Sequence, residues 1–199
     1  MNSLVDILKS CGDLFPYCFV ISDLEGPDSP LVYANDNFLK LIGRTREEVV
    51  GFNCRFLQGE ETSKEAINMI RMALRERECC FQDILNYKKD GTPFWNRLML
   101  IPVVSDVLGV RYYVGIQQDI SEKFAKSQNS SQGIPSVRQA PSASVLSRVK
   151  NPLTDIINSL RSLRYLSDDP SVAMQTRQQI VERLKSDISE LCQYVYHLD

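Results

Sequence analysis

The sequence carries little net charge, and it has no long apolar run. Its 23 basic and 25 acidic residues nearly cancel, for a formal net charge of -2, so no basic field favours nucleic acid or an anionic membrane. No apolar run is long enough to span a bilayer, and the segment 1–6 lacks the basic start and apolar core of a secretion signal. We therefore expect a cytoplasmic protein that binds neither nucleic acid nor membrane.

Metal-binding patterns are missing as well. The chain has a single histidine, His197, and no two of its cysteines form a C-x-x-C pair. The six cysteines are Cys11, Cys18, Cys54, Cys79, Cys80 and Cys192. We predict no metal site, and we expect these thiols to be reduced, as they are in the cytosol.

A small mixed domain is expected between residues 16 and 126. Apolar runs predict strands, and caps followed by helical spacing predict short helices. The expected strands are 17–22, 31–34, 79–87, 93–103 and 110–118, with Asp90-Gly91 as a hairpin turn. The expected helices follow Asn35, cover 46–50, 53–57 and 121–126, and run from Thr62 to about Arg77, with Ile67, Ile70, Met72 and Leu74 on a partly apolar face. This order predicts an α+β fold with a five-stranded antiparallel sheet.

Residues 1–15 precede this domain. Leu4, Ile7, Leu8 and Cys11 have helical spacing, and Gly12 follows them as a stop signal. We predict an N-terminal cap helix, which either covers an edge of the next domain or forms a dimer contact.

The most specific stretch is Asn53-Cys54-Arg55-Phe56-Leu57-Gln58. A cysteine is often only a small buried hydrophobe. This run of six residues, however, resembles the adduct-forming signature of LOV (light-oxygen-voltage) photosensor domains of the PAS superfamily. Further stretches resemble plant-type LOV domains in order and spacing, at 19–23, 33–38, 85–91, 94–96 and 115–117.

The resemblance implies a flavin site. Asn86, Asn96 and Gln117 carry carboxamides that donate and accept hydrogen bonds, and the two asparagines would contact the pyrimidine edge of the ring. Asn53 and Gln58 would contact the ribityl chain or the ring edge. The implied walls are Val20, Ser22, Leu57, Leu98, Leu100, Tyr113 and Gly115, with Leu98 standing where a phenylalanine is common in the family.

The resemblance also implies a phosphate site and a choice of flavin. Arg55 and Arg71 would bind the phosphate, because the guanidinium fork bonds phosphate bidentately. Arg71 lies thirteen residues after Gln58, without the insertion that FAD-binding LOV domains often carry. FMN is therefore favoured over FAD.

A light-driven switch is the implied function. The sulfur of Cys54 would bond to carbon C4a of the excited ring while N5 gains a proton, and the adduct would decay in the dark. Gln117 would report the change at N5 by rotating its carboxamide, which exchanges donor and acceptor. A flavin redox sensor, in which Cys54 matters little, is an alternative.

Two further segments follow the sensor. Residues 127–143 are rich in Ser, Gln and Pro and predict a flexible linker. Residues 144–199 show the apolar spacing of a helical hairpin, broken at Ser167–Pro170. Because two helices bury little surface, we expect a homodimer that forms a four-helix bundle through 144–199.

The segment Ser147–Thr154 resembles the phosphoacceptor box of sensor histidine kinases, with Ser147 in place of the histidine. Serine does not supply an imidazole, and no glycine follows Gly133 to form an ATP lid. We therefore predict a hairpin without kinase activity, a protein that is not an enzyme, and a kinase or response regulator as partner. The alternatives are an ordinary coiled-coil hairpin, or a light-regulated kinase that acts through a partner's ATP-binding domain.

Overall fold

A computed structural model describes residues 17–105 and 109–128, together with the single positions Lys9, Gly12, Asp13, Gln179, Glu182, Arg183, Ser186 and Glu190. These single positions are all helical. Since Gly12 and Asp13 are among them, the prediction that the N-terminal helix stops at Gly12 is wrong. The other residues of 1–15, most of the predicted linker 127–143, and the predicted hairpin 144–199 apart from its five single positions lie outside the described residues.

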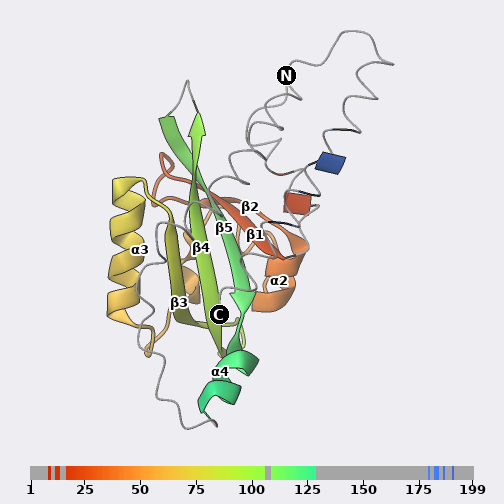
Figure 1. The fold of residues 1–199 in the computed structure, drawn as a ribbon, viewed down its shortest axis with the longest axis vertical. Helices are drawn as coiled ribbons and strands as arrows, with labels where there is room; N and C mark the ends of the chain where they lie inside the picture. Colours follow the sequence, from red (N-terminus) through yellow and green to blue (C-terminus); the bar gives the residue numbers. More distant parts are fainter. Residues whose placement is uncertain are drawn as a thin grey trace. The chain divides into compact units, whose positions relative to one another are not determined.

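Five strands form one sheet in the order β2-β1-β5-β4-β3 (Figure 1). The strands are β1 Cys18–Asp23, β2 Leu31–Ala34, β3 Cys80–Tyr87, β4 Pro93–Ser105 and β5 Gly109–Asp119. All four pairings are antiparallel, and every strand lies where the sequence predicts it, with its ends shifted by at most a few residues. The predicted five-stranded antiparallel sheet is confirmed.

The connection between β3 and β4 is a tight hairpin turn. The Lys88 backbone N–H donates to the Thr92 carbonyl at 2.9 Å, and the Gly91 N–H donates to the Lys88 carbonyl at 3.0 Å. Gly91 has a φ of 85°, which glycine adopts without steric cost. The Asp90-Gly91 turn signal is therefore confirmed.

The described helices are α2 Asp36–Ile42, the 3-10 helix η1 Cys54–Leu57, α3 Lys64–Glu76 and α4 Ser121–Gln128. Asn35 caps α2 as predicted, because its Oδ1 accepts from the Phe38 N–H at 3.0 Å. The same oxygen accepts from the Phe19 N–H at 3.0 Å. One buried side chain thus starts α2 and fastens it to β1.

Two local predictions are wrong because tertiary contacts decide them. Residues 46–50 form a turn in which the Arg46 carbonyl accepts from the Val49 N–H at 3.1 Å and from the Val50 N–H at 2.8 Å. The next N–H, that of Gly51, donates to the Leu31 carbonyl at 2.8 Å instead, so the turn does not propagate into a helix. The cap of α3 is Ser63, whose Oγ accepts from the Ala66 N–H at 3.2 Å. Thr62 is engaged elsewhere: its hydroxyl donates to the Leu85 carbonyl in β3 at 2.8 Å.

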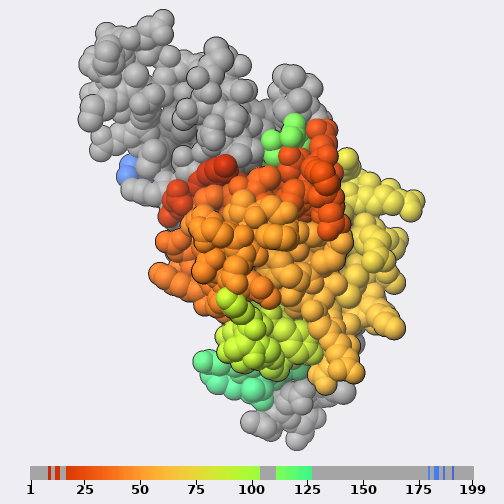
Figure 2. Space-filling view, turned by 180° about the vertical axis from the view of Figure 1, so that it is seen from behind, coloured from red at the N-terminus to blue at the C-terminus, as the bar shows by residue number. Residues whose placement is uncertain are grey.

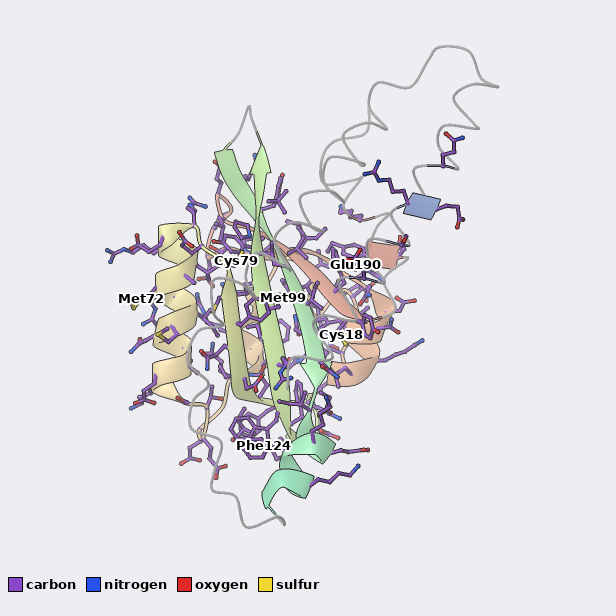
Figure 3. The ribbon with its side chains drawn as sticks, viewed as in Figure 1. Cys18, Met72, Cys79, Met99, Phe124 and Glu190 are labelled. Atoms are coloured by element: carbon purple, nitrogen blue, oxygen red, sulfur yellow. The ribbon has the colours of Figure 1, made fainter. Side chains whose placement is uncertain are left out.

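The apolar face of α3 is also placed differently at one position. Met72 is 60% exposed and points away from the sheet (Figure 3). Ile70, Ala73 and Leu74 pack inward instead. Met72 was predicted on the inward face, but its neighbour Ala73 holds that position.

Within the part of the chain that the structure describes, two apolar clusters cover one face of the sheet. The first contains Val20, Leu31, Ala34, Phe38, Ile42, Val49, Leu57 and Phe94. The second lies beneath α3 and joins Cys80, Leu100 and Tyr113 to Leu24, Ile70, Ala73, Leu74 and Leu98. Seen from behind in Figure 2, the chain from β2 to α3, coloured orange to yellow, covers this face. Within the described residues no helix has both the length and the apolar character that crossing a membrane requires.

Candidate functional site

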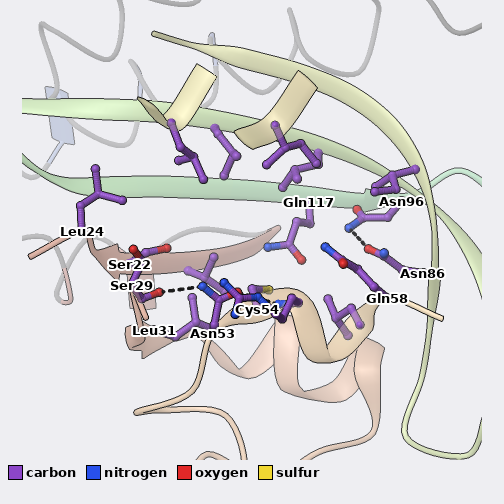
Figure 4. A pocket seen from close by; sticks show the side chains of 18 residues that line it. Ser22, Leu24, Ser29, Leu31, Asn53, Cys54, Gln58, Asn86, Asn96 and Gln117 are labelled. Atoms are coloured by element: carbon purple, nitrogen blue, oxygen red, sulfur yellow. Dashed lines mark hydrogen bonds between the residues drawn. The ribbon is translucent and has the colours of Figure 1, made fainter. Parts of the chain in front are cut away.

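Members of both clusters line one cavity between the sheet and the helices (Figure 4). The volume of the cavity that is open to the centres of water molecules is about 110 Å³. A single water needs about 10–15 Å³ by the same measure, so the cavity can hold a group much larger than water. The lining residues are Val20, Ser22, Leu24, Ser29, Leu31, Asn53, Cys54, Arg55, Leu57, Gln58, Ile70, Leu74, Ile84, Asn86, Asn96, Leu98, Leu100 and Gln117.

Cys54 is the first residue of η1, and Asn53 sets its position. The Asn53 Oδ1 accepts from the Arg55 N–H at 3.0 Å, which caps the short helix and leaves the cysteine at its start. Burial raises the pKa of the Cys54 thiol to about 12. No lining residue is acidic or a histidine, so the lining contains no base that would ionise the thiol.

Gln117 faces the cavity from β5, on the opposite side from Cys54 (Figure 4). Its side chain is 2% exposed, and neither its Nε2 nor its Oε1 has a hydrogen-bond partner among protein atoms. A buried carboxamide without partners costs about 1–3 kcal/mol. Such a group is expected to be satisfied by something that enters the cavity.

Asn86 and Asn96 form a second polar group in the same cavity. The Asn96 Nδ2 donates to the Asn86 Oδ1 at 2.9 Å, and the Asn86 Nδ2 donates to the Leu85 carbonyl at 3.1 Å. The Asn96 Oδ1 is buried without a partner. One acceptor therefore remains open on this side of the cavity, next to Gln58 (Figure 4).

Arg55 is the only charged residue among the lining residues, all of which belong to the described part of the chain. Its Nη1 lies 2.7 Å from the Asp28 Oδ1. A lining that combines one cation with several carboxamides suits a molecule with a polar ring edge and an anionic tail. The apolar walls suit the faces of a flat ring.

Twelve of the residues predicted for the flavin site line this cavity, and three do not. Arg71 is exposed, and its Nη1 donates to Asn68 Oδ1 at 2.9 Å, because α3 presents Ile70 and Leu74 to the cavity instead. Tyr113 packs against α3 instead of lining the cavity, and its hydroxyl donates to the Glu78 carbonyl at 3.0 Å. Gly115 sits beneath the wall, where a β-carbon would lie 2.7 Å from Val20 Cγ2.

The sequence reading missed six lining residues: Leu24, Ser29, Leu31, Ile70, Leu74 and Ile84. Ile84 had a usable signal, since it lies two residues before Asn86 on the same strand and therefore shares its face. Ile70 and Leu74 were expected on an apolar helix face but without a link to the cavity. Ser29 follows a turn and offered no signal.

Comparisons with known proteins agree with this geometry. A family profile described as PAS domain matches residues 16–122, which is more than half of the chain. The solved LOV domain of a blue-light activated histidine kinase from Erythrobacter litoralis is 42% identical, with a TM-score of 0.52, over 53% of this chain and 97% of that domain. The chain belongs to the PAS family, as a LOV domain protein.

Full-length relatives extend well beyond this LOV chain. Blue-light-activated histidine kinase 2 of Erythrobacter litoralis (strain HTCC2594) is 38% identical over 153 residues, which are 77% of this chain and 42% of that protein. Phototropin-2 of Oryza sativa subsp. japonica is 41% identical over 111 residues, 56% of this chain and 12% of that protein. The chain thus spans less than half the length of either relative.

These relatives correct one expectation. The prediction that the protein is not an enzyme is contradicted, because relatives of this LOV chain are named histidine kinases, and histidine kinases are enzymes. The prediction rested on Ser147 in place of a histidine and on the lack of later glycines, and both observations concern only the segment printed here.

Proposed function

We propose that this chain is a blue-light photoreceptor that binds FMN in the cavity and responds to light through a reversible bond from Cys54. One observation carries the proposal: the thiol of Cys54 and the unpartnered carboxamide of Gln117 face the same cavity from opposite sides. A thiol alone would suit many ligands. Together with the amides and one cation, it suits a flavin.

The cavity residues divide into three binding roles. Asn86, Asn96 and Gln58 would bond the polar edge of the ring, since Asn96 Oδ1 is an open acceptor. Asn53 would contact the ribityl chain, and Arg55 the phosphate. The walls would come from Val20, Ser22, Leu57, Leu98 and Leu100. Without an insertion for an adenine between Gln58 and α3, FMN fits this chain better than FAD.

When bound, the flavin would supply blue-light absorption and an excited ring that a thiol can attack. Cys54 would supply that thiol with its proton in place, because its pKa is raised to about 12. The thiol proton would pass to N5 of the ring as the sulfur bonds to carbon C4a, so no base is required from the protein. This agrees with a lining that holds no acidic residue and no histidine.

Gln117 would pass the change to the end of the domain. It lies on β5, which ends at Asp119, and α4 begins at Ser121. The Ser121 hydroxyl bridges these parts, donating to Asp119 Oδ1 at 2.5 Å and accepting from the Trp95 N–H at 2.9 Å. A rotation of the Gln117 carboxamide would therefore act on the strand that positions α4.

Absorption spectroscopy of the purified chain tests this function. We expect a structured blue band that bleaches under blue light and returns in darkness. The variant Cys54→Ala should keep the band and lose the bleaching. A colourless protein, or a band in the wild type that ignores light, would contradict the proposal, and a redox sensor would replace it if the band responded only to reductant.

A histidine-kinase type of output is the second part of the proposal. The similarity to the Erythrobacter kinase extends over 153 residues, whereas the PAS match covers only residues 16–122, so part of the similarity lies outside the sensor. We propose that light acts on a dimer formed through 144–199, with a kinase or response regulator as partner.

Arg71 would reach the phosphate of the bound flavin only by moving away from Asn68.

The output is tested separately from the photocycle. The chain is incubated with labelled ATP and with a response regulator, in darkness and in light, and its mass in solution is measured in both conditions. Phosphorylation or a dimer that changes with light supports the proposed output. A light-independent monomer without phosphorylation rejects the output and leaves the photoreceptor proposal standing.

A further inference from the structure

We infer that Asp28 determines which flavins the cavity prefers, because it competes with a ligand's phosphate for Arg55. This inference rests on the proposed flavin site. It predicts that Asp28 weakens the binding of FMN but leaves the binding of riboflavin, which lacks the phosphate, nearly unchanged.

The competing contact is short and lies at the edge of the cavity. The Arg55 Nη1 and the Asp28 Oδ1 are 2.7 Å apart, and the two side chains are 60% and 59% exposed. Arg55 lines the cavity, as does Ser29, the residue after Asp28. An anionic group entering beside Arg55 would therefore meet the carboxylate of Asp28 as well.

Asn53 fastens the segment that carries Asp28. Its Nδ2 donates to the Asp28 carbonyl at 2.6 Å. The same Nδ2 donates to the Ser29 carbonyl at 3.4 Å (Figure 4). Its Oδ1 caps η1 through the Arg55 N–H. One side chain thus holds the acid-bearing turn against the short helix that bears both Arg55 and Cys54.

The backbone adds to this restraint. Asp28 and Ser29 have φ values of 62° and 49°, in the left-handed region that few residues other than glycine, asparagine and aspartate adopt readily. An aspartate at this position can keep the turn while presenting a charge. Asparagine tolerates the same φ, so it removes the charge without altering the turn.

The competition between Asp28 and a phosphate matters because the cavity lining offers a single positive charge. Arg55 is the single cation among the lining residues, and Arg71 is occupied by Asn68 outside the lining. A phosphate that pairs with Arg55 must displace the Asp28 carboxylate or accept repulsion from it. Because both groups are exposed, the effect is modest and screened by salt.

The experiment compares FMN with riboflavin on flavin-free protein in the dark. Dissociation constants are measured by flavin fluorescence for the wild type, for Asp28→Asn and for the control Asp36→Asn. Asp36 forms a solvent-exposed pair with Arg46 at 2.8 Å, with the two side chains 75% and 41% exposed, and neither residue lines the cavity. Asp28→Gly, which also accepts a positive φ, is a second variant without the carboxylate.

For both Asp28 variants we expect FMN to bind roughly two- to fivefold more tightly relative to riboflavin, an effect that shrinks at high salt. The control should leave the ratio unchanged. An unchanged or lower preference for FMN in Asp28→Asn and Asp28→Gly overturns the inference. If the wild type binds neither flavin, the proposed function fails instead, so the two failures are distinguishable.

Discussion

Val20 and Gly115 are paired across β1 and β5, and a β-carbon on Gly115 would lie 2.7 Å from the Val20 Cγ2. Such a carbon would also lie 3.5 Å from the Gln117 Nε2 and the Leu100 Cδ2. The absent side chain at Gly115 therefore lets three lining residues approach the strand closely. The wall of the cavity depends on a residue that does not itself line it.

The variant Gly115→Ala is expected to lower the free energy of unfolding by about 1–3 kcal/mol, the usual cost of overpacking a filled core. It should also weaken flavin binding, because Val20 must move into the cavity. Urea denaturation and a flavin titration measure the two effects. In the background Val20→Ala the added methyl has room, so its cost should fall; an equal cost in both backgrounds would show that Val20 is not the group in contact.

The variant Gln117→Leu is expected to stabilise the flavin-free protein by about 1 kcal/mol, because it removes two buried polar atoms that lack protein partners and keeps most of the volume. The same change should abolish or delay the proposed light response at α4 while leaving the proposed bond formation at Cys54 in place. Thermal unfolding and hydrogen exchange in α4 measure these outcomes. A destabilised Gln117→Leu protein would mean that the carboxamide is already satisfied.

The variant Asn35→Ala is expected to cost roughly 2–4 kcal/mol of unfolding free energy. It removes the α2 cap, worth about 1 kcal/mol, and leaves the buried Phe19 N–H without its acceptor. Denaturation by urea measures the loss. Asn35→Asp keeps the acceptor and should lose less; equal losses would point to the donor bond from Asn35 Nδ2 to the Tyr17 carbonyl, 2.6 Å, as the larger contribution.

The ion pair of Asp23 and Arg111 should make stability depend on pH. Hydrogen bonds from Arg111, at 2.8 Å from Nη2 to Oδ2, hold the pKa of Asp23 below its usual value of 3.8. A depressed folded-state pKa gives a contribution that is present above 3.8 and is lost as the pH falls through the lower folded value. Asp23→Asn should therefore destabilise the protein at pH 7 by an amount that shrinks in acid. A difference that stays constant from neutral to acid pH would assign the effect to packing.

Local signals predicted the elements whose structure is decided locally. Asp90-Gly91 predicted its turn because the backbone there needs a positive φ, and Asn35 predicted α2 because it bonds three residues ahead. Thr62 and Ser63 are both acceptable caps. Only the position of the Leu85 carbonyl, in a strand far along the chain, makes Ser63 the cap.

The cavity walls were harder to assign than its polar groups. Asn86, Asn96 and Gln117 stand out as buried amides, but β4 is apolar on both faces. Leu98 and Leu100 face the cavity, whereas Met99, which alternates with them, is fully buried on the other face. Because polar and apolar residues do not alternate along such a strand, the sequence does not indicate which of its faces lines the cavity. Tyr113 shares the cavity face of β5, yet α3 covers it, which strand periodicity does not reveal.

The raised pKa of Cys54 has a chemical consequence in darkness. With its pKa raised to about 12 by burial, this thiol stays almost entirely protonated at neutral pH. Peroxide and alkylating agents attack the thiolate form, so this sulfur is protected from the ordinary oxidative losses of exposed cysteines. If Cys54 forms and releases the proposed bond at each exposure to light, its thiol would thus remain chemically intact between exposures.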